Sequence, residues 1–288
     1  MPNDKVMDLI DLLNLKQIEK NIFEGQNKDI GGPMVFGGQV LAQALNAAMR
    51  TVKTAVNVHS MHAYFILPGN IDLPIRYEVD CIRDGRSFVT RRIVAFQKNK
   101  AIFNMAASFH RFEEGYNHQI EMLNVPPPES LMSFTQYANE MANKFDLMLI
   151  KTFADNSPID FRPVEQINLM NPGKKPPFRH VWFKADGTLP NDKNIHQCVA
   201  AYASDFNLLT TALLPHNVSM FQGKMQLASL DHAMWFHRDF KADEWLLYAI
   251  DSPSASNARG FCRGSIFSRN GQLVASVTQE GLMRLWNR

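Results

Sequence analysis

The sequence predicts an α+β protein of two tandem units, in each of which a curled antiparallel sheet wraps around a long central helix. The first observation is a repeat: residues 58–111 and 227–284 are similar, which indicates that one supersecondary unit is used twice. The second is that a long apolar helix pattern precedes each copy. One buried helix for each antiparallel sheet is typical of an α+β layer arrangement. We therefore expect the two sheets to lie side by side in one continuous surface.

The first unit is predicted to occupy residues 1–115. It begins with a short surface helix over 7–15 and an edge strand over 18–25. The segment from 39 to 50 is apolar on nearly every side, which predicts a buried helix rather than an amphipathic one. Four strands separated by short turns follow, in the spacing of an antiparallel meander. Their ranges are 60–67, 75–82, 87–97 and 101–112.

Residues 116–156 are predicted to connect the units, because three consecutive prolines at 126–128 precede a helical stretch over 129–153. The second unit is predicted to occupy residues 157–288 and to repeat the order of helix, then strands. Its long helix is expected over 192–214. Its strands are expected over 159–168, 179–185, 225–237, 245–251, 259–268 and 273–283.

Composition excludes several classes of protein. The net charge of +2 is spread along 288 residues, which argues against a nucleic-acid surface. No apolar run is long enough for a membrane span. Three scattered cysteines favour neither a disulfide framework nor a zinc site, so we expect a reducing, cytoplasmic location without a metal or cofactor. Exposed sheet edges predict a homo-oligomer, either a dimer or a tetramer.

Asp205 is the single acid of residues 196–214, where it stands among apolar residues. An ionised carboxylate is rarely left in such surroundings without partners, because its desolvation is costly. The matching stretch of the first unit, residues 35–49, carries no acid, so the fold itself does not require one. Asp205 therefore either serves the chemistry, or caps a break in the helix, or faces solvent at a subunit edge.

Gln279 is predicted to point inward, because side chains alternate along a strand and it shares a face with Ala275 and Val277. Its counterpart in the first unit is Ala107. A buried amide needs several hydrogen bonds. Either a nearby carboxylate and a water would supply them, or the backbone would.

Ser229, Asp231 and His232 are close in sequence, but they do not predict a catalytic triad. Neighbours on a strand point to opposite faces, and the chain has no G-x-S-x-G elbow. The pattern leaves open whether Ser229 faces inward. His232 aligns with His62 of the first copy, which favours a structural role for both.

Several unconnected motifs follow one another along nearly the whole chain: VFGGQVLAQAL, RDGRSF, RPVE, YASDFNLL, LDHAMWFHRDF, EWLLY, SASNARGF and VASVTQEGLMR. In sequence and order they resemble the acyl-CoA thioesterase II family, which has a double hotdog fold. The resemblance implies a hydrolase that releases a free fatty acid and coenzyme A from acyl-CoA. It also implies that Asp205, Ser229 and Gln279 orient and activate the attacking water. A threonine often replaces Ser229 in this family, and serine keeps the hydroxyl.

Four further residues are candidates for contacts with the substrate. Gly37 and Gly38 are candidates for the oxyanion, because glycine permits close backbone approach. Arg259 and Arg263 are candidates for the nucleotide phosphates, although solvated strand edges also explain such arginines.

Two alternatives remain. A hotdog enoyl-CoA hydratase would share the fold, but it would need a paired Asp and His at the start of a helix, and the sequence places no such pair near Asp205. A non-catalytic protein that binds acyl-CoA, or a regulatory one, would bind the thioester without hydrolysing it.

Overall fold

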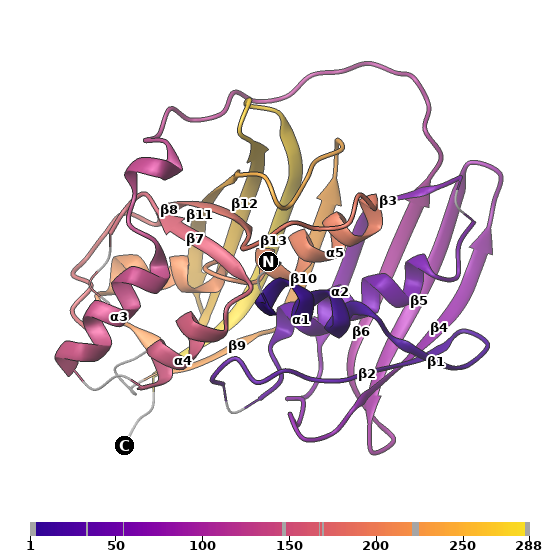
Figure 1. Ribbon diagram of the computed structural model, residues 1–288, viewed down its shortest axis with the longest axis horizontal. Coiled ribbons are helices and arrows are strands. Elements are labelled where there is room, and N and C mark those ends of the chain that lie inside the picture. The colour runs from indigo at the N-terminus through magenta and orange to yellow at the C-terminus, as the bar shows by residue number, and fades with distance from the viewer. Residues whose placement is uncertain are drawn as a thin grey trace.

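The computed structural model describes residues 4–32, 34–53, 55–145, 148–166, 168, 170–220 and 225–285. These residues form one large antiparallel sheet with two central helices packed against it, as Figure 1 shows, which confirms the predicted α+β class. The outermost ends of the two predicted units, 1–3 and 286–288, lie outside the described residues.

The strands of the first half differ from the prediction in two ways. The expected edge strand is a hairpin, because Asn21 has a left-handed φ of 62° and turns the chain between β1 and β2. The strand β3 pairs with β6 rather than β4. The elements are α1 (Asp4–Leu13), β1 (Lys16–Glu19), β2 (Ile22–Gly25), α2 (Gly37–Met49), β3 (Asn57–Phe65), β4 (Ile75–Asp84), β5 (Phe88–Gln97) and β6 (Lys100–His110).

The second half contains two breaks, of which the one in the helix was an open alternative for Asp205 and the one in the strand was not predicted. The long helix stops at Ser204 and resumes as a 3-10 helix, and the strand expected over 225–237 is interrupted at Leu230. The elements are β7 (Ile159–Pro163), β8 (Phe178–Ala185), α5 (Lys193–Ser204), η2 (Leu209–His216), β9 (Met225–Ser229), β10 (Asp231–Phe236), β11 (Leu246–Ser256), β12 (Arg259–Ser268) and β13 (Leu273–Leu285).

The two halves share one sheet, in the order β1-β2-β4-β5-β6-β3-β10-β13-β12-β11-β8-β7, with β9 paired to β13. The seam is the antiparallel pair of β3 and β10, in which Met61 lies opposite Met234. Both methionines are fully buried. The expected continuous surface is therefore present, while the division into units at 1–115 and 157–288 stays a prediction.

The central helices α2 and α5 cross in close contact and in opposite directions. The first turn of α2 meets the last turn of α5, where a Cβ on Gly38 would lie 2.4 Å from the Tyr202 carbonyl oxygen. At the other end of α2, Met49 contacts Cys198, with a sulfur–sulfur distance of 3.8 Å. Only glycine permits this approach at position 38. Gly38 therefore allows the start of α2 to contact the end of α5.

The connector crosses from one half of the sheet to the other as an extended segment over 111–127, which arches over the sheet in Figure 1. The single helical stretch expected over 129–153 is instead a 3-10 turn, η1 (Pro128–Ser130), and two helices, α3 (Phe134–Phe145) and α4 (Met148–Asn156).

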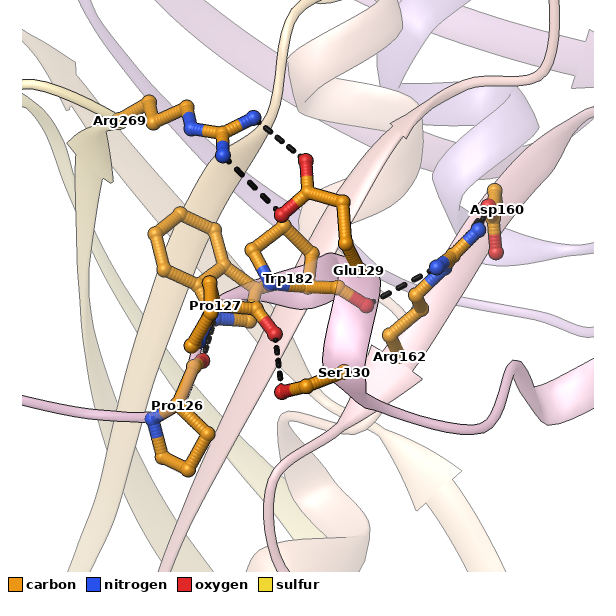
Figure 2. Close-up of polar contacts among 9 residues, drawn as sticks. Pro126, Pro127, Glu129, Ser130, Asp160, Arg162, Trp182 and Arg269 are labelled. Atoms are coloured by element: carbon orange, nitrogen blue, oxygen red, sulfur yellow. Dashed lines mark hydrogen bonds and ion pairs between the residues drawn. The ribbon is translucent and has the colours of Figure 1, made fainter.

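Polar contacts hold the end of the connector against the second half of the sheet, as Figure 2 shows. The indole N–H of Trp182 donates to the Pro126 carbonyl at 2.9 Å. Arg162 donates to the Pro128 carbonyl at 2.9 Å. Glu129 and Arg269 form an exposed ion pair at 2.6 Å.

We expect Trp182→Phe to lower the free energy of unfolding by about 1–3 kcal/mol, because it removes a buried donor and part of a buried ring. Urea denaturation measures this change. Glu129→Gln removes only the exposed ion pair and should leave the unfolding midpoint unchanged. Equal midpoints for the wild type and Trp182→Phe would mean that the Trp182 contact does not hold the connector.

Candidate active site

Asp205 lies at the C-terminal end of α5, where it is the capping residue of the helix break. The backbone leaves the helix because Asn207 adopts a left-handed φ of 67°, and Arg179 donates to the Asn207 side-chain oxygen at 2.8 Å. The Asp205 side chain is only 7% exposed. Of the alternatives open from the sequence, the cap is present and exposure to solvent is wrong, while a role in the chemistry stays a prediction.

The Asp205 carboxylate contacts groups from both halves of the sheet. It accepts a hydrogen bond from Gln279 Nε2 at 2.8 Å and one from the backbone N–H of Gly38. A Cβ on Gly37 would fall 2.7 Å from Oδ2. Burial raises the pKa of Asp205, and the hydrogen bonds from Gln279 and Gly38 oppose that rise. The carboxyl is thus a better proton acceptor than an exposed aspartate.

Gln279 joins the acid to the hydroxyl. Its side chain is fully buried and faces the helices, as the alternation along the strand predicts. Nε2 donates to Ser229 Oγ at 3.1 Å as well as to Asp205. The other amide atom, Oε1, is buried and accepts no hydrogen bond from the described residues. A buried acceptor of this kind calls for a donor such as a water.

A β-bulge at Leu230 determines which way Ser229 points. Ser229 lies opposite Gly281, and Ala233 lies opposite Thr278. Between them Glu280 faces two residues, since its carbonyl accepts from the Leu230 N–H and its N–H donates to Asp231 Oδ1. The extra residue reverses the alternation. Ser229 and the residue three positions later, His232, therefore both face Gln279.

His232 belongs to this cluster, and sequence reasoning missed it. It is fully buried, with Nδ1 3.3 Å from Gln279 Nε2 and Nε2 3.0 Å from Ser204 Oγ. Burial lowers the pKa of His232 to about 3, so its imidazole is neutral. Nδ1 lies 3.9 Å from Asp205 Oδ1, but His232 is on a strand and Asp205 ends a helix, so the two are not the Asp and His pair at a helix start that a hydratase would need.

The bulge at Leu230 also makes the alignment of His232 with His62 wrong. His62 is exposed on the opposite face of the sheet and pairs with Ala233. The residue of the first half that matches His232 is Met61, which lies opposite Ala107 as His232 lies beside Gln279.

The first half of the chain has an apolar version of the whole cluster. Val58 precedes a register shift in β3, as Ser229 precedes the bulge before β10. Val58, Met61 and Ala107 are all buried, and they match Ser229, His232 and Gln279. The polar groups are thus an addition to a framework that packs well without them.

The structure does not bring Arg259 and Arg263 to this cluster. They alternate along β12 with the buried Gly260 and Cys262, so they lie on the sheet face opposite the helices. Arg259 pairs with Glu280 at 2.9 Å, and Arg263 pairs with Asp251 at 2.6 Å. Binding of nucleotide phosphates by either arginine stays a prediction.

Within the described ranges, no group of three or more His, Cys, Asp or Glu side chains is placed to hold a metal ion. None of the helices described there has the length and apolar character needed to cross a membrane.

Comparison with known proteins places the chain among thioesterases. A sequence model described as "Acyl-CoA thioesterase" matches residues 150–282, and one described as "Acyl-CoA thioesterase N-terminal domain" matches residues 25–110. Acyl-CoA thioesterase 2 of Haemophilus influenzae is 41% identical over 98% of this chain and 99% of its own length. Acyl-coenzyme A thioesterase 8 of Homo sapiens is 38% identical over 95% of this chain and 88% of its own length.

Solved structures agree with this placement. The crystal structure of an acyl-CoA thioesterase II from Mycobacterium marinum is 40% identical, with a TM-score of 0.79 over 96% of this chain and 98% of that one. A protein of unknown function with a hot dog fold from Alicyclobacillus acidocaldarius has a TM-score of 0.78 at 18% identity, over 96% of this chain and 98% of its own. These similarities confirm the expected hotdog fold.

We expect Gly38→Ala to lower the free energy of unfolding by about 1–3 kcal/mol, because its Cβ would meet the Tyr202 carbonyl and force α2 away from α5. Denaturant unfolding measures the change. Gly115→Ala is the matched control, since a Cβ at Gly115 has nothing within 4 Å. If both variants unfold at the wild-type midpoint, the helix crossing does not depend on Gly38.

The raised pKa of Asp205 predicts a dependence of stability on pH. At pH values between the ordinary aspartate pKa of about 4 and the raised pKa of Asp205 in the folded state, the folded protein holds a proton that the unfolded chain has released. The stability contributed by Asp205 therefore falls as the pH rises through that range. We expect the Tm of the wild type to fall relative to that of Asp205→Asn as the pH rises above about 4. Calorimetric scans in which the two curves stay parallel would contradict this.

Proposed function

Because this chain belongs to the acyl-CoA thioesterase family, and is a thioester hydrolase that acts on acyl-CoA, we propose that Asp205, Ser229 and Gln279 carry its chemistry. The observation that supports this assignment most directly is the Gln279 amide, which donates to Asp205 and Ser229 while its own buried oxygen lacks a donor among the described residues. A water that donates to Gln279 Oε1 would lie beside both the carboxylate and the hydroxyl.

In the proposed reaction Asp205 accepts a proton from this water, and the water oxygen attacks the thioester carbonyl carbon. Gln279 Oε1 accepts the second hydrogen of the water, and Ser229 Oγ supplies a further contact that orients it. The tetrahedral intermediate then expels the coenzyme A thiolate, and the proton held by Asp205 returns to the sulfur. The products are a free fatty acid and coenzyme A, and the enzyme forms no covalent intermediate.

The oxyanion contact is proposed for the start of α2. The Gly38 N–H at this end reaches Asp205, and the positive end of the helix dipole favours negative charge there. The Gly38 N–H already bonds the Asp205 carboxyl. We therefore assign the contact with the oxyanion to Gly37.

Aromatic side chains beside the cluster would line the path of the acyl chain. Phe36 stacks on Phe206 with ring centroids 4.2 Å apart, and it meets Tyr202 edge-on at 5.1 Å. Phe65 lies close to Gly37. Apolar side chains of this kind suit contact with a fatty acyl group.

Two further properties are proposals. Self-association into a dimer or tetramer is supported by β1, an edge strand of the sheet whose four residues are all exposed. A cytoplasmic location is supported by three cysteines that are all free.

The geometry weighs against the hydratase alternative. Both ring nitrogens of His232 are hydrogen-bonded within the protein, to Gln279 and Ser204, so the imidazole does not face a substrate. Thiol release from a panel of acyl-CoAs separates hydrolysis from hydration and from binding alone. Only a hydrolase releases thiol, so the absence of thiol across the panel would favour one of the alternatives.

We expect Asp205→Asn to lower kcat by about two to four orders of magnitude, because it removes the proposed base. Release of coenzyme A thiol measures the rate, and a wild-type circular dichroism spectrum confirms folding. Asp80→Asn is the matched control, since Asp80 pairs with Arg92 in an exposed position. A folded Asp205→Asn enzyme with wild-type turnover would remove Asp205 from the mechanism.

A further inference from the structure

A chain of hydrogen bonds runs from the α5 backbone to Gln279, and its direction is fixed at its first member. The Ala201 carbonyl can only accept, and Ser204 Oγ lies 2.9 Å from it. The single hydroxyl hydrogen of Ser204 is therefore used in this bond. Ser204 Oγ is left as an acceptor for the next group in the chain.

The next group is His232, whose Nε2 lies 3.0 Å from Ser204 Oγ. Since Ser204 accepts, Nε2 must carry the proton of the neutral ring. Nδ1 then has a free lone pair 3.3 Å from Gln279 Nε2, whose two hydrogens are shared among Asp205, Ser229 and His232. An acceptor at this position allows the Gln279 amide only one orientation, with its NH₂ group toward His232 and its oxygen away.

Asp205 favours the same orientation only while it is ionised. As a carboxylate, it accepts from Gln279 Nε2 at 2.8 Å. Once it has taken a proton from the water, the acid can itself donate, and a rotated Gln279 could accept that bond through Oε1. The contact with Asp205 therefore stops restraining the amide in the middle of the reaction, whereas the lone pair of His232 Nδ1 remains.

From this geometry we infer that His232 is a positioning residue, which together with Ser204 holds the Gln279 amide in one orientation throughout turnover. The inference rests on the function proposed above and extends it. His232 does not exchange a proton with the substrate. It keeps Gln279 Oε1 directed at the water and prevents the amide from rotating when Asp205 is protonated.

The first half of the chain supplies the variant that tests this inference. Methionine stands at the matching buried position 61, so His232→Met places in this pocket a side chain that the framework accepts. It removes the acceptor beside Gln279. We expect kcat to fall by about 10- to 100-fold, with KM for the acyl-CoA within about threefold of the wild type, because orientation rather than binding is lost.

Two further variants separate positioning from packing. In His232→Asn the side-chain oxygen can take the place of Nδ1, so we expect kcat to recover to within about threefold of the wild type. Ser204→Ala releases the ring to carry its proton on Nδ1, and kcat should fall as it does in His232→Met. In the double variant Ser204→Ala/His232→Met the two losses of kcat should not add, because both substitutions interrupt the same chain of hydrogen bonds. His62→Met, on the exposed face, should retain wild-type rates.

All five variants and Asp205→Asn are assayed together for thiol release and Tm. If His232→Met and Ser204→Ala turn over at the wild-type rate while Asp205→Asn is impaired, the positioning chain is wrong and the proposed function stands. Wild-type turnover in Asp205→Asn would instead remove the proposed function. Should His232→Met fail to fold, Ser204→Ala and His232→Asn decide, and a kcat loss in His232→Asn as large as in a folded Ser204→Ala would overturn the inference.

Discussion

The close crossing of α2 and α5 is the constraint on which the rest of the structure depends. Because Gly38 has no side chain, the start of α2 reaches the last turn of α5, where Asp205 ends the helix. That contact gives the carboxylate a backbone donor from the other half of the chain. A buried charge would otherwise be costly at this place, so the crossing makes the acid tolerable as well as correctly placed.

The sequence predicted the layers of the fold well, because apolar periodicity and turn residues are local signals. The range expected for the first central helix, 39–50, differs from α2 by two residues at its start and one at its end. The order of strands was less predictable, since β3 could pair with β4 or β6 and only tertiary packing decides. The expected range of the second helix, 192–214, ran through its break because Asn207 in a left-handed conformation leaves little trace in a helical pattern, and only the capping alternative for Asp205 allowed for it.

The candidate site shows the same limit in finer detail. Alternation along an unbroken strand gave the direction of Gln279. It left the direction of Ser229 open and did not show that Ser229 and His232 share a face, because the bulge at Leu230 adds one residue and reverses the alternation after it. An alignment of the two repeats by sequence matched His232 with His62, whereas the strand register matches His232 with Met61. A bulge is set by the ladder of the neighbouring strand, and a single sequence does not contain that information.

The apolar counterpart of the cluster in the first half has a kinetic consequence. With Val58, Met61 and Ala107 packed where the second half carries polar groups, each chain has a single cluster of the kind proposed as the reaction centre among its described residues. Two substrate molecules therefore cannot influence one another between twin centres inside one polypeptide. If the velocity of this enzyme ever depended sigmoidally on acyl-CoA concentration, the coupling would have to pass between separate polypeptides.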